Sequence, residues 1–76
     1  MPFECATFED FQLAADGSEK FLLLESDEEI FIGTSQFFFY TKNPTTELTQ
    51  KVKSWLRGRT IVRIKGFRRP EDVLKA

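Results

Sequence analysis

Histidine is absent from this 76-residue chain, and cysteine occurs once, at Cys5. Without histidine, the chain lacks the commonest general base and the commonest zinc ligand besides cysteine. A single cysteine excludes an intramolecular disulfide, on which small secreted domains usually depend. We therefore expect a cytoplasmic protein that has no metal site and no cofactor.

Long hydrophobic runs are also absent, since none approaches the roughly 20 residues that a membrane-spanning helix needs. The first ten residues, "MPFECATFED", have neither the basic start nor the long apolar stretch of a secretory signal. We expect neither a membrane segment nor a secretory signal.

The residues that catalysis requires are scattered. Cys5 has no histidine to activate it, and the serines lack a nearby base. Glu9 and Asp10 are adjacent on an expected strand, so their side chains point to opposite faces and do not converge as an acid–base pair must. The four glycines form no phosphate-binding loop. We expect no enzyme and no small-molecule substrate.

What the chain does contain is aromatic and charged. It is 41% hydrophobic and 30% charged, which is typical of a globular protein, and it has nine phenylalanines. Each buried aromatic side chain removes about 150–250 Å² of surface from water, so this content can build a core in a short chain. We expect one domain over residues 1–76.

Charge is distributed unequally along the chain. Residues 1–50 carry ten acidic and two basic residues, a net charge of −8, whereas residues 51–76 carry two acidic and nine basic residues, a net charge of +7. Such a split indicates either a polarised surface that meets a charged partner or ion pairing between the two halves.

Residues 43–58 form the clearest predicted helix. Asn43 is a suitable N-cap, Pro44 suits the first turn, and Gly58 suits the position after the last turn. An apolar stripe at helical spacing supports this helix, and it consists of Leu48, Val52, Trp55 and Leu56.

The other segments read as strands. The Asp16-Gly17 pair predicts a hairpin turn between the first two of them. The expected strands are residues 5–14, 20–25, 30–33, 37–40 and 59–67, and residues 70–76 read as either a short closing helix or a frayed tail.

These elements predict an α+β fold in ββββαβ order, an antiparallel meander packed by one helix. We favour a sheet curled into a small barrel or half-barrel. The predicted core consists of Phe8, Phe11, Leu13, Phe21, Leu23, Ile30, Ile32, Phe37, Phe39, Leu48, Val52, Trp55, Leu56, Val62 and Ile64.

The segments "FLLL" and "FFFY" are apolar on both faces of their strands, whereas one helix covers one face. Curling of the sheet, a fold-back of Val73 and Leu74, or a partner chain could each cover the other face. We favour leftover aromatic surface that binds a protein partner or a second copy of the chain. The expected contact residues are Phe38, Tyr40, Arg63, Lys65 and Phe67.

The basic end of the chain supports an alternative function, nucleic-acid binding, because cations can pair with phosphates and aromatic rings can stack on bases. The sequence pI of about 5.4 counts against it. An edge strand also carries basic residues simply to prevent aggregation. The residues of this alternative are Arg57, Arg59, Arg63, Lys65, Arg68 and Arg69.

Overall fold

The structure of the protein, a computed structural model, describes residues 2–64. In this part of the chain, five strands form one sheet and two helices pack on it, which confirms the α+β class. The elements in chain order are β1 (Phe3–Glu4), α1 (Phe8–Ala14), β2 (Lys20–Glu25), β3 (Glu29–Gly33), β4 (Phe37–Lys42), α2 (Thr46–Leu56) and β5 (Thr60–Arg63). The expected closing helix over residues 70–76 lies outside the described residues.

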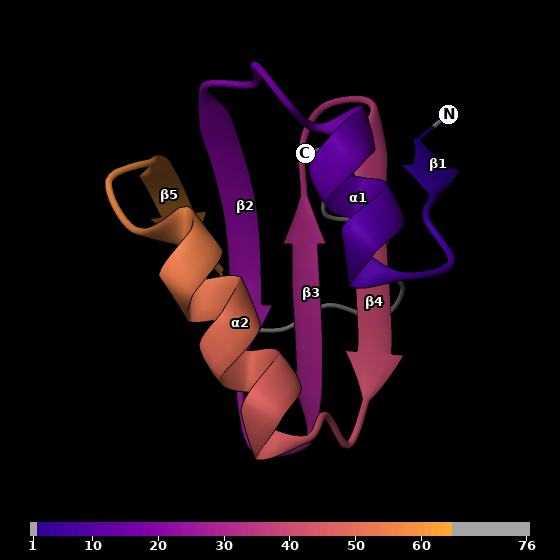
Figure 1. Ribbon diagram of the computed structural model, residues 1–76, viewed down its shortest axis with the longest axis vertical. Helices are drawn as coiled ribbons and strands as arrows, with labels where there is room; N and C mark the ends of the chain where they lie inside the picture. The colour runs from indigo at the N-terminus through magenta and orange to yellow at the C-terminus, as the bar shows by residue number, and fades with distance from the viewer. Residues whose placement is uncertain (1, 65–76) are drawn as a thin grey trace.

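The sheet is open and mixed, so the expectation of an antiparallel barrel is wrong. Strands β2, β3 and β4 form an antiparallel meander, and β1 and β5 join its two sides in parallel, giving the order β1-β4-β3-β2-β5. Figure 1 shows β1 and β5 at opposite edges of the sheet. The barrel does not close because the segment expected to be its first long strand is a helix.

That helix, α1, begins at the N-cap Thr7, whose side-chain oxygen accepts a hydrogen bond from the Asp10 amide at 3.1 Å. Two acidic residues in the first turn complement the positive end of the helix dipole. Phe8 and Phe11, three positions apart, lie on one helix face and are buried. Gly17, with φ of 88°, turns the chain from α1 into β2 rather than between two strands.

Helix α2 confirms the predicted helix, but it begins later than the sequence indicated. Its N-cap is Thr45 rather than Asn43, because the Thr45 hydroxyl accepts from the Leu48 amide at 3.0 Å. Asn43 instead takes a left-handed conformation, with φ of 50°, in the turn before the helix. The helix ends at Leu56, and Gly58 follows in the left-handed region, as predicted.

Both helices lie on the same face of the sheet, in front of it in Figure 1. The Trp55 ring of α2 joins the layers there. Its centroid lies 5.8 Å from that of Phe8, 5.9 Å from that of Phe11 and 5.2 Å from that of Phe21, and each pair has edge-to-face geometry. These contacts tie α1, α2 and β2 into one core, and aromatic pairs of this kind add about 0.5–1.5 kcal/mol each beyond their buried area.

The opposite face of the sheet, which we call the second face, carries a smaller apolar cluster. Phe31 and Phe38 stack with centroids 5.6 Å apart, and both are buried together with Leu24. Gly33 belongs to this packing, because a Cβ atom there would lie 3.0 Å from the Phe31 ring. The "FFFY" segment therefore has its first and third rings toward the helices and its second ring within the second-face cluster.

The predicted core is largely confirmed. Leu13 and Val62 are exceptions, with exposed fractions of 80% and 37%, because Leu13 is on the outer side of α1 and Val62 is on an edge strand. Four members are partly buried, namely Phe37, Leu48, Trp55 and Ile64. The buried members are Phe8, Phe11, Phe21, Leu23, Ile30, Ile32, Phe39, Val52 and Leu56.

Truncating a side chain on the buried side of α1 should destabilise the protein much more than truncating one on its exposed side. Phe11→Ala removes a fully buried ring and should lower the free energy of unfolding by about 3–5 kcal/mol. Leu13→Ala, at an exposed position of the same helix, should change it by less than about 0.5 kcal/mol. Urea unfolding followed by circular dichroism measures both. Equal losses in the two variants would contradict the helical assignment of residues 8–14.

Candidate interaction surfaces

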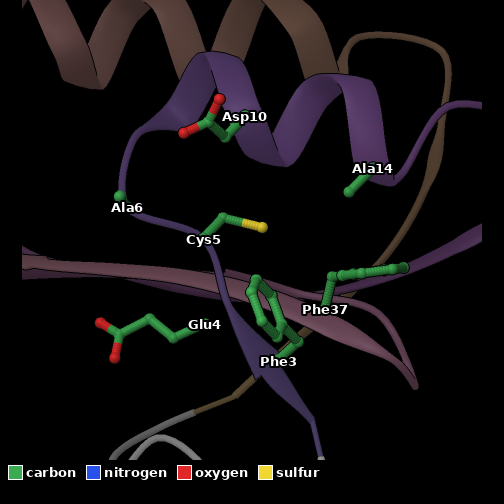
Figure 2. Close-up of a pocket in the computed structure, with 7 residues that line it drawn as sticks. All are labelled: Phe3, Glu4, Cys5, Ala6, Asp10, Ala14 and Phe37. Atoms are coloured by element: carbon green, nitrogen blue, oxygen red, sulfur yellow. The ribbon is translucent and has the colours of Figure 1, made fainter.

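A groove lies between β1 and α1, at the edge of the sheet. Its volume is about 310 Å³, and it is lined by Phe3, Glu4, Cys5, Ala6, Asp10, Ala14 and Phe37. Figure 2 shows α1 on one side and β1 on the other, with the Cys5 sulfur pointing into the space between them. Three segments therefore build this groove: β1 with its following loop, the adjacent helix α1, and the start of β4, which is distant in sequence.

Phe3 is the most exposed aromatic side chain of the described residues, with an exposed fraction of 66%. Its ring meets that of Phe37 edge to face, with centroids 6.3 Å apart. The pair lies at the mouth of the groove, where Ala14 contributes a third apolar side chain from α1. An exposed aromatic ring beside an apolar concavity is typical of an interaction site.

The backbone of β1 is bonded on one side. The Phe3 amide donates to the carbonyl oxygen of Gln36 at 2.9 Å, and the Cys5 amide donates to that of Phe38 at 2.7 Å. Because successive residues of a strand direct their amide groups to opposite edges, the N–H and C=O of Glu4 point away from β4. No described strand lies on that side, so β1 presents a strand edge.

Two acidic residues line the groove, Asp10 from α1 and Glu4 from β1, and none of the lining residues is basic. In Figure 2, Asp10 projects from α1, while the Glu4 side chain extends away from the helix. Burial raises the pKa of the Cys5 thiol, and the negative charges of Asp10 and then Glu4 raise it further. The groove is thus an apolar site with an acidic rim, and its thiol is held in the protonated form.

The predicted protein contact involves residues that the structure places apart. Phe38 and Tyr40 lie on the second face of β4, whereas Arg63 pairs with Leu23 and shares its helix-covered face on β5. Strands β3 and β2 separate β4 from β5. Phe38 is buried, and the Tyr40 hydroxyl donates to the Glu29 carboxylate at 2.9 Å. Lys65 and Phe67 lie outside the described residues.

The basic residues of the alternative function gather at one place. Arg57 is the C-cap of α2, Arg59 lies in the following turn, and Arg63 lies on β5, so all three are at the edge opposite the groove. The Arg59 guanidinium lies 4.2 Å from the Trp55 ring centroid, and its Nε donates to the Trp55 carbonyl at 2.9 Å. Lys65, Arg68 and Arg69 are outside the described residues.

Two lysines of α2 have acidic partners. Lys51 pairs with Glu9 of α1, and Lys53 pairs with Glu25 of β2 at 3.2 Å. Among the described residues, Arg57 and Arg63 form no ion pair. Pairing between the acidic and basic halves therefore uses part of the positive charge and leaves the guanidinium groups at the β5 edge.

Comparisons with known proteins give no assignment: no family model matches the chain, and no curated protein or solved structure shows significant similarity to it. Within residues 2–64, neither helix is long and apolar enough to cross a membrane. The same residues contain no group of three or more acidic or cysteine side chains arranged to hold a metal ion. The physical features of the chain are thus the basis for a functional proposal.

Sequence reasoning missed the groove because it read residues 5–14 as a strand. One local signal could have revealed it: Thr7 followed three residues later by Asp10 resembles a helix-capping pattern. The short spacing between Phe8 and Phe11 also fits a helix. No local signal identifies Phe3, whose role depends on the parallel pairing of β1 with the distant β4.

The Cys5 thiol offers a direct test of the groove's electrostatics. Its pKa in the folded chain should lie above the ordinary value of 9.0, and Asp10→Asn should lower it because one of the raising charges is removed. The unfolded chain then releases this proton at lower pH than the folded chain, so stability should fall as the pH rises through that interval. Thiolate ultraviolet absorbance against pH measures the pKa, with Cys5→Ser as the blank. An unchanged pKa in Asp10→Asn would contradict the arrangement.

Proposed function

We propose that this chain is a non-enzymatic protein-interaction module of the cytoplasm, of the regulatory, adaptor, inhibitor or subunit type. The position of Phe3 is the observation that carries the proposal. This ring is largely exposed beside an apolar groove and a strand edge, and among the described aromatic rings it meets Phe37. Exposed aromatic side chains with these surroundings are typical anchors of protein interfaces.

Polarised charge supports the same proposal. Glu4 and Asp10 lie at the β1 and α1 edge of the sheet, whereas Arg57 and Arg63 lie at the β5 edge. Such a distribution orients an approaching partner and raises the association rate more than the affinity. It also permits a second copy of the chain to be the partner, with the acidic edge of one meeting the basic edge of the other.

The chemistry of the described residues supports binding rather than catalysis. Cys5 is buried and its thiol pKa is raised, the opposite of what activates a nucleophile. The pKa of Tyr40 is also raised, by burial and then by the hydrogen bond to Glu29, so its hydroxyl stays protonated. Neither group is prepared to attack or to accept a proton at neutral pH.

Capture experiments on the native cell extract test this proposal. Phe3→Ser should remove the captured protein, because it deletes the anchor at the mouth of the groove. Leu13→Ser is the matched control, since Leu13 is also an exposed apolar residue of this region but does not line the groove. Circular dichroism checks that both variants fold. Equal capture by wild type and Phe3→Ser would overturn the proposed contact surface.

Nucleic-acid binding is a second candidate, favoured by the grouping of Arg57, Arg59 and Arg63 at one edge. Arg57 and Arg63 have no acidic partner among the described residues, which leaves them able to contact phosphates. The face of the Trp55 ring is already occupied by Arg59, so a base would have to displace that guanidinium in order to stack there.

Anisotropy titration of a labelled single-stranded oligonucleotide at two low salt concentrations tests this candidate. If it is correct, Arg63→Gln should weaken binding and reduce the slope of log K against log salt by about 0.7 for the lost phosphate contact. Lys42→Gln removes the same charge from the end of β4, on the other side of the sheet, and serves as the control. Absence of wild-type binding at low salt excludes the candidate.

A further inference from the structure

The groove and the strand edge of β1 adjoin, and together they define a binding mode. The outward N–H and C=O of Glu4 are available to one further strand beside β1. Pro2 has no N–H, and β1 has only two residues, so such a strand gains few main-chain hydrogen bonds. Its affinity must therefore come largely from side chains.

A strand added beside β1 directs every second side chain toward α1, as Phe3 of β1 and the following Cys5 do. Those side chains would enter the space between α1 and the sheet, which Phe3, Phe37 and Ala14 line with apolar atoms. The volume of about 310 Å³ is at the lower end for ligand pockets. It suits an apolar side chain of a peptide better than a larger organic molecule.

The acidic residues beside the groove favour a basic residue near that apolar side chain of the incoming strand. Asp10 borders the groove from α1 and Glu4 borders it from β1, with no basic residue in the lining to neutralise them. A lysine or arginine on the same face of the incoming strand, two residues from the apolar side chain, comes to the side of Asp10. Both carboxylates are exposed, so this complementarity adds selectivity and a faster association rather than much affinity.

We propose that β1 and the adjoining groove bind an extended segment of a partner protein, which adds to the sheet beside β1, inserts an apolar side chain next to Phe3 and places a lysine or arginine at Asp10. Recognition by strand addition combines main-chain hydrogen bonds with pockets for alternate side chains, which give specificity. The inference rests on the proposed function, because it specifies the partner of the same surface.

Defined peptides test this mode independently of the native partner. The probe is an acetylated, amidated, fluorescently labelled peptide of alternating threonines, with a central leucine and a lysine two residues further on. We expect saturable binding by fluorescence anisotropy. Replacing the leucine by serine should weaken binding at least about tenfold. Methylation of the peptide nitrogens that face β1 should also weaken binding, since it removes hydrogen-bond donors and places methyl groups between the two strands.

Protein variants locate the site. Phe3→Ser should weaken peptide binding as strongly as the loss of leucine does, whereas Leu13→Ser should leave it unchanged. Asp10→Lys should weaken binding of the lysine peptide and restore binding to a peptide with glutamate at that position. This exchange of preference separates a direct charge contact from a loss of structure. In amide hydrogen exchange, the Glu4 N–H should be protected only when peptide is bound.

Several results would overturn the inference. They are the absence of saturable binding by the leucine–lysine peptide, an equal effect of Phe3→Ser and Leu13→Ser, or no change of preference in Asp10→Lys. Sedimentation in which the wild-type chain associates and Phe3→Ser does not would identify a second copy as the occupant and also overturn it. If peptides do not bind but Phe3→Ser still loses the captured native protein, strand addition is wrong and the proposed function stands.

Discussion

The packing of three phenylalanine rings around Trp55 is the interaction on which the rest of the structure depends. Phe8 and Phe11 bring α1 to this cluster, Phe21 brings β2, and Trp55 brings α2. Because all of these rings lie on one side of the sheet, both helices are held there as neighbours. Helix α1 then lies over the β4 and β1 side, and the short segment before it returns beside β4 as β1. The groove is a direct result of this placement.

Much of the fold could be predicted because its determinants are local. The stripe of α2 and the strand character of residues 20–25, 37–40 and 60–63 follow from side-chain spacing and β-propensity within each segment. Helix α1 could not be predicted in the same way, since seven residues form a helix that is marginal by itself. Its stability comes from burying Phe8 and Phe11 against partners far away in the sequence. The parallel pairings of β1 with β4 and of β5 with β2 are likewise non-local. The sequence does not indicate them, and a closed antiparallel sheet was expected instead.

The candidate site was harder to predict from the sequence than the fold was. The apolar character of both faces of these strands was recognised, but the expectation that the second face stays exposed is wrong, because Leu24, Phe31 and Phe38 are buried there. Phe31 and Phe38 pack against each other on the second face, with Gly33 leaving room for the Phe31 ring. The aromatic ring that is most exposed comes instead from Phe3, in a segment with no distinguishing pattern. The clustering of Arg57, Arg59 and Arg63 was predictable because these residues are close in sequence.

Because β1 is short, its edge of the sheet should open more easily than the centre of the sheet. Since this strand contributes two residues and its outward ring is mostly in water, little buried surface is lost when it separates from β4. We therefore expect opening at this edge to cost less free energy than opening of β3, which would disrupt both apolar clusters. A ligand that bridges β1 and α1 would close this local equilibrium, so that part of its binding free energy would be consumed in ordering the start of the chain.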